Sequence, residues 1–240
     1  MPLRIKRKGL TKGQSFVELA LVVPILALLL AGVVEIAFLY FSYMSALDLT
    51  REAARFASAR DYRMEEAPES GLPFSACTDA SLHYYYDTSC FFIDPEINSS
   101  LEISPTDFAD VAISVFTVTG NQVTNRWPTE NPDGSPNSDG VFSLYQSNVA
   151  GTLVPNWKLD CEGNIVRTEP YMTNSELEAL FQPNAPTEKG FVLVEVYYCY
   201  HHKIGLPFLT WAIPNPMRMH AYTIMPAAEA IPTPTPIVNP

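Results

Sequence analysis

The stretch FVELALVVPILALLLAGVVEIAFLYF, residues 16–41, decides how this chain is organised. Twenty-two of its 26 residues are apolar, and it contains no lysine or arginine. As an α-helix it would be about 39 Å long, which exceeds the ~30 Å hydrocarbon core of a bilayer. No other stretch approaches the length of about 18 apolar residues that a membrane span requires. The sequence therefore predicts one transmembrane helix, over residues 16–42, and argues against a polytopic transporter or channel.

Charge is distributed very unevenly on the two sides of this stretch. Residues 1–15 hold five cations and no acid, whereas residues 44–240 hold ten cations and 24 acids. By the positive-inside rule, the basic leader lies in the cytoplasm and the rest of the chain lies outside the cytoplasmic membrane. The net charge of −11 argues against a general nucleic-acid binder. We expect five segments: a leader (1–15), the membrane helix (16–42), a helical extension (43–66), a β-rich extracytoplasmic domain (67–226) and a tail rich in proline and threonine (227–240).

A cleaved secretory signal peptide is the competing interpretation of a basic leader followed by an apolar stretch. Its hydrophobic region is usually about 7 to 15 residues long, much shorter than this one. The first A-x-A pattern after the stretch, at residues 57–59, comes too late for ordinary signal cleavage. We therefore expect a retained membrane anchor.

Two acids lie within the apolar stretch, where a carboxylate at the bilayer centre costs about 2.5 to 3.5 kcal/mol. Glu35 lies near the outer end, where its side chain can reach the interface, and Glu18 lies near the inner end. A glycine after a basic leader, followed by four residues and then a glutamate, is typical of type IV prepilins, and Gly13 and Glu18 fit this spacing. The alternative for Glu18 is an ordinary anchor residue that extends to the inner headgroups.

Residues 13–58, GQSFVELALVVPILALLLAGVVEIAFLYFSYMSALDLTREAARFAS, resemble the N-terminal module of TadE-like proteins, which are pseudopilins of the tight-adherence (Tad) pilus and secretion machinery. The resemblance rests on these features: Gly13-Gln14, Val17-Glu18, Pro24, Glu35, the aromatics Phe38, Tyr40 and Phe41, and Ala53-Ala54-Arg55. It implies that a prepilin peptidase cleaves after Gly13, so that Gln14 becomes the N-terminus and Glu18 the fifth residue. It also implies that the carboxylate of Glu18 neutralises the α-amine of an adjacent subunit. The implied partners are other Tad pilins and pseudopilins, inner-membrane platform proteins and the peptidase, in addition to the lipid bilayer.

Beyond the membrane, the pattern predicts a continued helix and then strands. Residues 45–60 have no proline or glycine, and small or apolar residues recur at steps of three and four, so the helix would reach about 45 residues and pack on a sheet. A solvated stalk is the alternative. Alternating apolar and β-branched residues predict strands at 111–119 and 191–200, with further strands at 218–225 and 141–145. A loop at 127–140 and a helix at 175–181 capped by Asn174 complete the expectation. The predicted fold class is α+β, and the resemblance implies a pilin-like antiparallel sheet.

Four cysteines, Cys77, Cys90, Cys161 and Cys199, all lie on the predicted outer side. Their even number favours disulfides, and four cysteines allow three pairings, which the sequence does not distinguish. Pairing Cys77 with Cys90 would close a short loop and leave Cys161 to join Cys199. Zinc is the rival interpretation, but the metal-binding spacings CxxC and HxxxH are missing, so we expect no metal.

Catalytic signatures do not occur in this sequence. It has no GxSxG, HExxH, GxxxxGK[ST] or GxGxxG pattern, so we expect neither an enzyme nor a cofactor. The sequence and the resemblance together predict a single-pass, pilin-like structural protein of Tad pilus assembly or secretion. The alternative is a membrane-anchored outer module, unrelated to pili, that binds or senses a surface ligand through loops bearing tyrosine and tryptophan.

Overall fold

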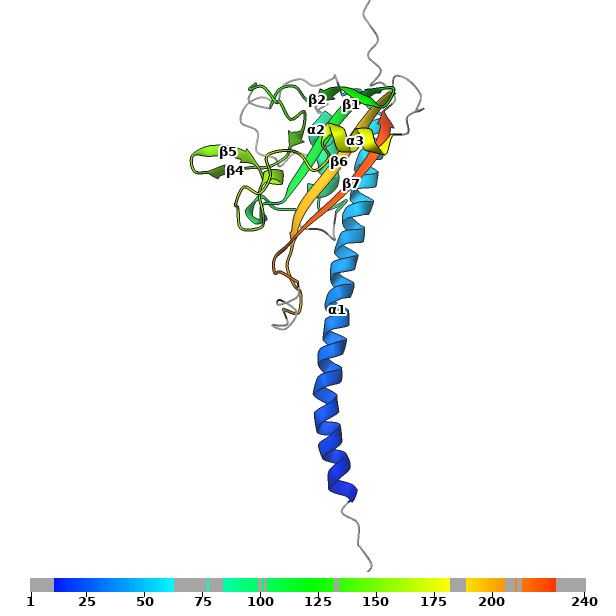
Figure 1. Cartoon of the computed structure of the whole chain (residues 1–240), viewed down its shortest axis with the longest axis vertical. Coiled ribbons are helices and arrows are strands. Elements are labelled where there is room, and N and C mark those ends of the chain that lie inside the picture. The colour runs from blue at the N-terminus through cyan, green and yellow to red at the C-terminus, as the bar shows by residue number, and fades with distance from the viewer. Residues whose placement is uncertain are drawn as a thin grey trace, which may run out of the picture. The chain divides into compact units, whose positions relative to one another are not determined.

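The computed structural model describes residues 11–62, 77, 84–98, 101, 103–131, 134–181, 189–205, 210 and 213–227 (Figure 1). The leader up to residue 10 and the tail from residue 228 lie outside this described part. The chain divides into two compact units. The helix unit comprises Met1–Phe41 and His202–Asn215, and the sheet unit comprises Ser42–His201 and Pro216–Pro240.

One continuous helix, α1 (Thr11–Ser58), contains the whole apolar stretch and the amphipathic segment that follows it (Figure 1). The predicted long N-terminal helix is thus confirmed. The helix continues through Pro24, although proline lacks the N–H that the helical ladder uses. It ends in a tightened turn, because the N–H groups of Ala59 and Arg60 donate to the carbonyls of Phe56 and Ala57, three residues back, at 3.3 and 3.1 Å.

The sheet unit is built on an antiparallel sheet in the order β2-β1-β6-β7, with a short β3 also paired to β1. The strands are β1 (Asp110–Thr119), β2 (Gln122–Trp127), β3 (Phe142–Ser143), β6 (Lys189–Tyr200) and β7 (Met217–Ala227). The three strands predicted at 111–119, 191–200 and 218–225 are confirmed as β1, β6 and β7. The strand expected at 141–145 is only the two residues of β3, and β2 was not expected. The α+β class is confirmed.

The C-terminal part of α1 packs on one face of this sheet. Ile113 pairs with Val194, and Val194 pairs with Thr223, so these three side chains share that face. Thr50 of α1 is fully buried, and its Oγ1 lies 3.0 Å from Oγ1 of Thr223. The alanines that approach the sheet are also fully buried: Ala46, Ala53, Ala54 and Ala57. Small side chains therefore let the helix backbone lie close to the sheet, as the alanine stripe predicted, and the solvated stalk is excluded.

We expect Ala53→Leu to lower the free energy of unfolding of the sheet unit by about 1–3 kcal/mol, because the added atoms have no space between α1 and the sheet. Glu52→Leu is the matched control, since Glu52 is exposed on the same helix and should change stability by about 0.5 kcal/mol or less. Denaturant unfolding of the full chain in detergent micelles measures both values. Equal stability of the two variants would contradict close packing at Ala53.

A second helix, α2 (Tyr84–Ile93), covers the same face and was not expected from the sequence. The ring of Tyr85 stacks on Phe142 of β3, with centroids 5.2 Å apart. Thr88 and Ser89 are buried, and their hydroxyls donate to the carbonyls of Tyr84 and Tyr85 at 2.7 and 2.8 Å. Phe91 of α2 also meets Phe56 near the end of α1, with ring centroids 5.1 Å apart. An aromatic-rich segment with high strand propensity is thus helical where it packs on both α1 and the sheet.

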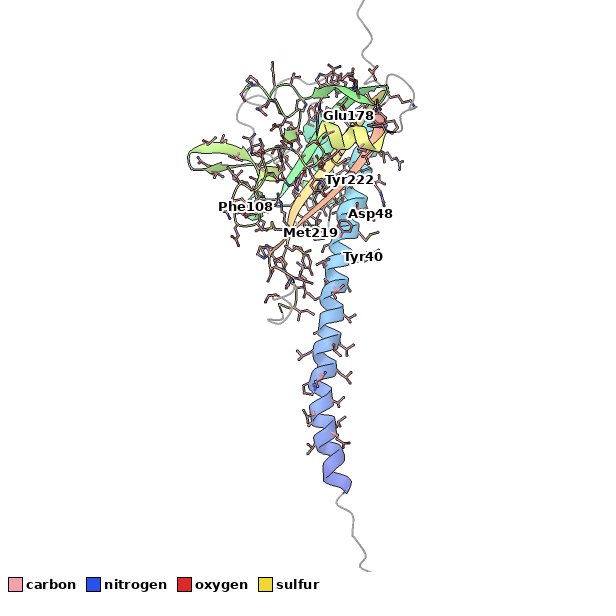
Figure 2. The ribbon with its side chains drawn as sticks, viewed as in Figure 1. Tyr40, Asp48, Phe108, Glu178, Met219 and Tyr222 are labelled. Atoms are coloured by element: carbon pink, nitrogen blue, oxygen red, sulfur yellow. A yellow bond between two sulfur atoms is a disulfide. The ribbon has the colours of Figure 1, made fainter. Side chains whose placement is uncertain are left out.

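The opposite face of the sheet is covered by the helix α3 (Asn174–Leu180) and by loops. The buried core between α3 and this face of the sheet includes Phe116, Val118, Met172, Leu177 and Leu193. The predicted cap was displaced by one residue: Thr173 caps the helix and forms a capping box with Glu176, and Asn174 is the first helical residue. Glu178, labelled in Figure 2, accepts a bond from the backbone N–H of Val123 at 2.9 Å and so ties α3 to β2.

The remaining elements lie in the loops of the sheet unit. They are two short 3₁₀ helices, η1 (Pro105–Asp107) and η2 (Asn156–Lys158), and a separate hairpin of β4 (Gln146–Val149) and β5 (Thr152–Pro155). Ala150 and Gly151 form the hairpin turn with φ of 52° and 90°, the positive range that two-residue turns use. Of the predicted loop at 127–140, Trp127 is the last residue of β2. The described loop residues, 128–131 and 134–140, are irregular apart from an isolated bridge between Glu130 and Pro136.

Candidate functional site

The membrane-length part of α1 exposes apolar side chains on all sides. Figure 2 shows these side chains radiating from the helix below the labelled Tyr40. By length and composition, α1 is a candidate membrane span from Phe16. The large exposed side chains of this segment include Phe16, Val17, Leu19, Leu21, Ile25, Leu29, Leu30, Val33, Ile36, Tyr40 and Phe41. A helix that is apolar all round requires an apolar solvent, and a bilayer provides one.

The residues predicted for processing and assembly lie at the start of this helix. Gly13 and Gln14 belong to the first turn of α1, and Glu18 lies a little more than one turn further on, where it is exposed. All three residues are thus on one short helical segment. Glu18 is separated from Glu35, the next acid in α1, by an uncharged apolar run over residues 19–34.

Glu35 is buried, with 2% of its surface exposed. Its Oε1 accepts a hydrogen bond from the backbone N–H of Lys203 at 2.9 Å, and its Oε2 accepts one from the N–H of Ile204 at 2.7 Å. These donors belong to the connection between β6 and β7, which shares the helix unit with Glu35. Sequence reasoning assigned Glu35 to the interface and missed this partner. A second acid in an apolar stretch was the signal that a partner had to exist.

Comparison with known families identifies the N-terminal part of the chain. Residues 13–55 match the family described as TadE-like protein. Residues 13–55 are a TadE-like region. No curated protein and no solved structure gives a significant match to the chain.

The TadE-like region begins at the predicted processing junction and ends in the part of α1 that packs on the sheet. It therefore includes Gly13, Gln14, Glu18, Glu35 and three of the four buried alanines, Ala46, Ala53 and Ala54. This region, together with its long apolar helix, suggests a protein associated with the Tad pilus. The family is generally non-enzymatic. The sheet, α2 and α3 lie beyond the matched residues.

Two disulfides stabilise the sheet unit beyond the TadE-like region. Cys77 pairs with Cys90 of α2, and Cys161 pairs with Cys199 of β6. Among the three possible pairings, this is the one that closes the short loop. Both bonds require an oxidising compartment, so disulfides and apolar helix together suggest a membrane-anchored extracytoplasmic domain.

Among the described residues of the sheet unit, the most deeply buried acid is a structural group at the start of β1. Asp110 is fully buried, and its carboxylate contacts Ser143 Oγ at 2.6 Å, the N–H of Trp157 at 2.9 Å and the N–H of Tyr145 at 3.0 Å. Burial raises the pKa of Asp110 to about 7, although these hydrogen bonds and the Arg218 guanidinium act in the opposite direction. Asp110 thus joins β1, β3 and η2, and sequence reasoning did not single it out.

A glutamate and a histidine also meet on the face of the sheet that α3 covers. Glu195 Oε1 is buried, lies 2.9 Å from His220 Nε2 and accepts a bond from the Tyr197 hydroxyl at 3.0 Å. The imidazole contacts the rings of Tyr171 and Tyr222, with centroids 4.1 and 5.7 Å away. Burial, followed by the charge of Glu195, raises the pKa of Tyr197 well above its ordinary value. These contacts satisfy the buried carboxylate, which is a structural role.

Two of the tryptophans considered for a ligand-binding surface are engaged within the sheet unit. Trp157 is 2% exposed and belongs to a core cluster with Ala112 and Tyr197. Trp127 packs on Tyr62, with ring centroids 5.0 Å apart. Trp211 lies outside the described residues. Trp157 therefore serves the core and half-buried Trp127 packs on another aromatic ring, so neither favours the ligand-binding alternative.

Proposed function

We propose that this protein is a single-pass, pilin-like structural subunit that acts in assembly of the Tad pilus or in the related secretion process. In this proposal α1 spans the cytoplasmic membrane, the basic leader lies inside, and the sheet unit lies outside. The observation that carries the proposal is a TadE-like region in which Glu18 lies at the start of the long apolar stretch of one continuous helix. The protein has no catalytic role, and its partners are other Tad pilins and pseudopilins, platform proteins and the prepilin peptidase.

The chemistry of assembly depends on the N-terminal segment. Hydrolysis of the Gly13–Gln14 peptide bond leaves a carboxylate on Gly13 and a free ammonium group on Gln14. Next to the hydrocarbon region an unpaired charge is expensive, and an opposite charge nearby offsets that cost. The carboxylate of Glu18 would supply the opposite charge to the amine of an adjacent subunit, which fixes the axial position of one helix against the next.

The mass of the native N-terminus tests this proposal. In cells that contain the prepilin peptidase, we expect a chain that starts at Gln14, because no ordinary anchor requires cleavage there. Gly13→Ile should leave the leader attached, since a branched side chain replaces the small residue at the junction. Gly9→Ala, which changes a leader glycine away from the junction, is the matched control and should be cleaved normally. A native chain that keeps its first residues in such cells would contradict processing.

A further inference from the structure

We propose that the β6–β7 connection is a second membrane contact, held by Glu35 at the outer boundary of the bilayer. The contact consists of Lys203 and Ile204, and its partner is the headgroup and upper acyl region of phospholipids. The inference rests on the proposed function in one respect, because it requires that α1 spans the membrane.

The depth of Glu35 in the bilayer follows from its distance to Glu18. The two residues are 17 positions apart in one helix, which is about 26 Å along its axis. The hydrocarbon core is ~30 Å thick. With Glu18 at the inner boundary, Glu35 lies only a few ångströms within the outer one. The aromatic side chains of Phe38, Tyr40 and Phe41 follow at the level where interfacial aromatics are enriched.

The two hydrogen bonds to Glu35 place Lys203 and Ile204 at this same depth. A carboxylate within the hydrocarbon region is poorly hydrated, so it needs hydrogen-bond donors from the protein. The backbone N–H groups of Lys203 and Ile204 supply one donor to each carboxylate oxygen. These bonds are charge-assisted and short, and they also satisfy backbone groups that would otherwise be unpaired near the hydrocarbon region. Glu35 therefore holds the connection on α1.

The base of the connection is closed by a further hydrogen bond. The backbone N–H of His202 donates to Oδ1 of Asn215 at 3.0 Å, which joins the residues that enter and leave the connection. Both residues belong to the helix unit, as do Glu35 and its two donors. The connection thus has its own internal bond besides the two that reach α1.

The side chains at this depth suit a lipid surface. Ile204 is 40% exposed, and Lys203 beside it is exposed as well. An apolar side chain next to a cation suits the boundary where acyl chains meet phosphate groups, since the aliphatic part enters the lipid and the ammonium group remains at the phosphates. In sequence, residues 205–213 read GLPFLTWAI and contain no charge. The chemistry therefore favours phospholipid over a soluble protein partner.

Spin-label accessibility in vesicles tests the proposal. The full chain, with both disulfides intact, is reconstituted into vesicles of phosphatidylcholine with a minority of phosphatidylglycerol. A nitroxide on Ile204→Cys should be relaxed more by oxygen, which concentrates in lipid, than by a water-soluble nickel complex. Adding Glu35→Ala should raise its accessibility to nickel about tenfold, because the connection is released into water. Glu35→Gln keeps one acceptor oxygen and should give an intermediate value.

Two further label positions separate the possible failures. A label on Leu153→Cys, in the exposed β4–β5 hairpin, should be aqueous with or without Glu35 and so controls for general unfolding. A label on Leu29→Cys reports whether α1 is in lipid. If Leu29 is in lipid and Ile204 is aqueous in the unaltered chain, the second contact is wrong and the proposed function stands. If Leu29 is also aqueous, α1 does not span the membrane and both proposals are wrong.

Discussion

Glu18→Ala is expected to leave the protein inserted and cleaved but to lower its assembly with neighbouring pilins by roughly a hundredfold to several thousandfold, because removing one partner of a desolvated ion pair costs about 3–5 kcal/mol. The cleavage junction at Gly13 and Gln14 is unchanged in this variant. The lost group is the carboxylate that would offset the ammonium charge of an adjacent subunit. Without it, that charge stays uncompensated at the edge of the hydrocarbon region.

Two companion variants make this prediction specific. Glu18→Gln keeps the size and polarity of the side chain but not its charge, so it should lose nearly as much assembly as Glu18→Ala. Glu52→Ala removes an exposed carboxylate from the sheet-packed part of the same helix and should assemble normally. Cross-linking in intact membranes, followed by co-purification with the other Tad pilins, measures assembly, and the N-terminal mass verifies cleavage. Normal assembly of the Glu18→Ala chain would contradict the proposal that Glu18 fixes the axial position of one helix against the next.

The sequence predicted the elements whose patterns are local and strong. The apolar stretch and the amphipathic segment behind it gave α1, and alternation gave β1, β6 and β7. These patterns work because a helix or strand repeats its burial over many residues. The strand β2 has no such repeat. Its residues QVTNRW are exposed or only half-buried, so its sequence shows no alternation of apolar and polar residues that would predict a strand. α2 was missed because its helix depends on packing against the end of α1 and the sheet rather than on its own propensity.

The residues of the candidate site also differ in whether a local sequence pattern could indicate them. Gly13, Gln14 and Glu18 could be proposed from the sequence because their spacing is contained within six residues. The partner of Glu35 could not be found, because Lys203 and Ile204 lie 168 and 169 positions away in sequence and contribute only backbone N–H groups. Asp110 was missed for a related reason, since its hydrogen-bond partners come from Ser143, Tyr145 and Trp157, and only the fold brings them together.

Asp110→Ala is expected to lower the free energy of unfolding of the sheet unit by about 3–5 kcal/mol, because buried N–H donors lose their shared acceptor and the Arg218 guanidinium loses an acid that interacts favourably with its charge. Arg218 is itself tied to the carbonyls of Phe108 and Asn156 at 2.7 and 3.0 Å, so it cannot move away easily. Asp48→Ala, an exposed aspartate on α1, is the control and should cost about 0.5 kcal/mol or less. Denaturant unfolding of the full chain in micelles measures both, and similar values for the two variants would contradict the role of Asp110.

The geometry around Asp110 also predicts how stability depends on pH. Ser143 Oγ lies 2.6 Å from Asp110 Oδ2 and 2.7 Å from the carbonyl oxygen of Tyr145, yet a hydroxyl has one proton to donate. A proton on Asp110 lets both contacts be hydrogen bonds, because the carboxyl then donates to Ser143 and Ser143 donates to Tyr145. This agrees with the direction in which burial moves the carboxyl pKa, from an ordinary value of 3.8 to about 7.

Because the folded-state pKa is the higher one, the folded protein holds a proton between about pH 4 and pH 7 that the unfolded chain has released. Stability should therefore be greatest near the acid end of this window and fall by up to about 4 kcal/mol as the pH rises through 7. The side chain of Asp110→Asn cannot titrate, so most of the dependence of the unfolding free energy on pH should be lost in this variant. Denaturant unfolding at pH 4.5, 6 and 8 measures that dependence. The variant should also be less stable at every pH, because its amide nitrogen faces the N–H of Tyr145 or Trp157. A slope equal to that of the unaltered protein would assign the pH dependence to other groups.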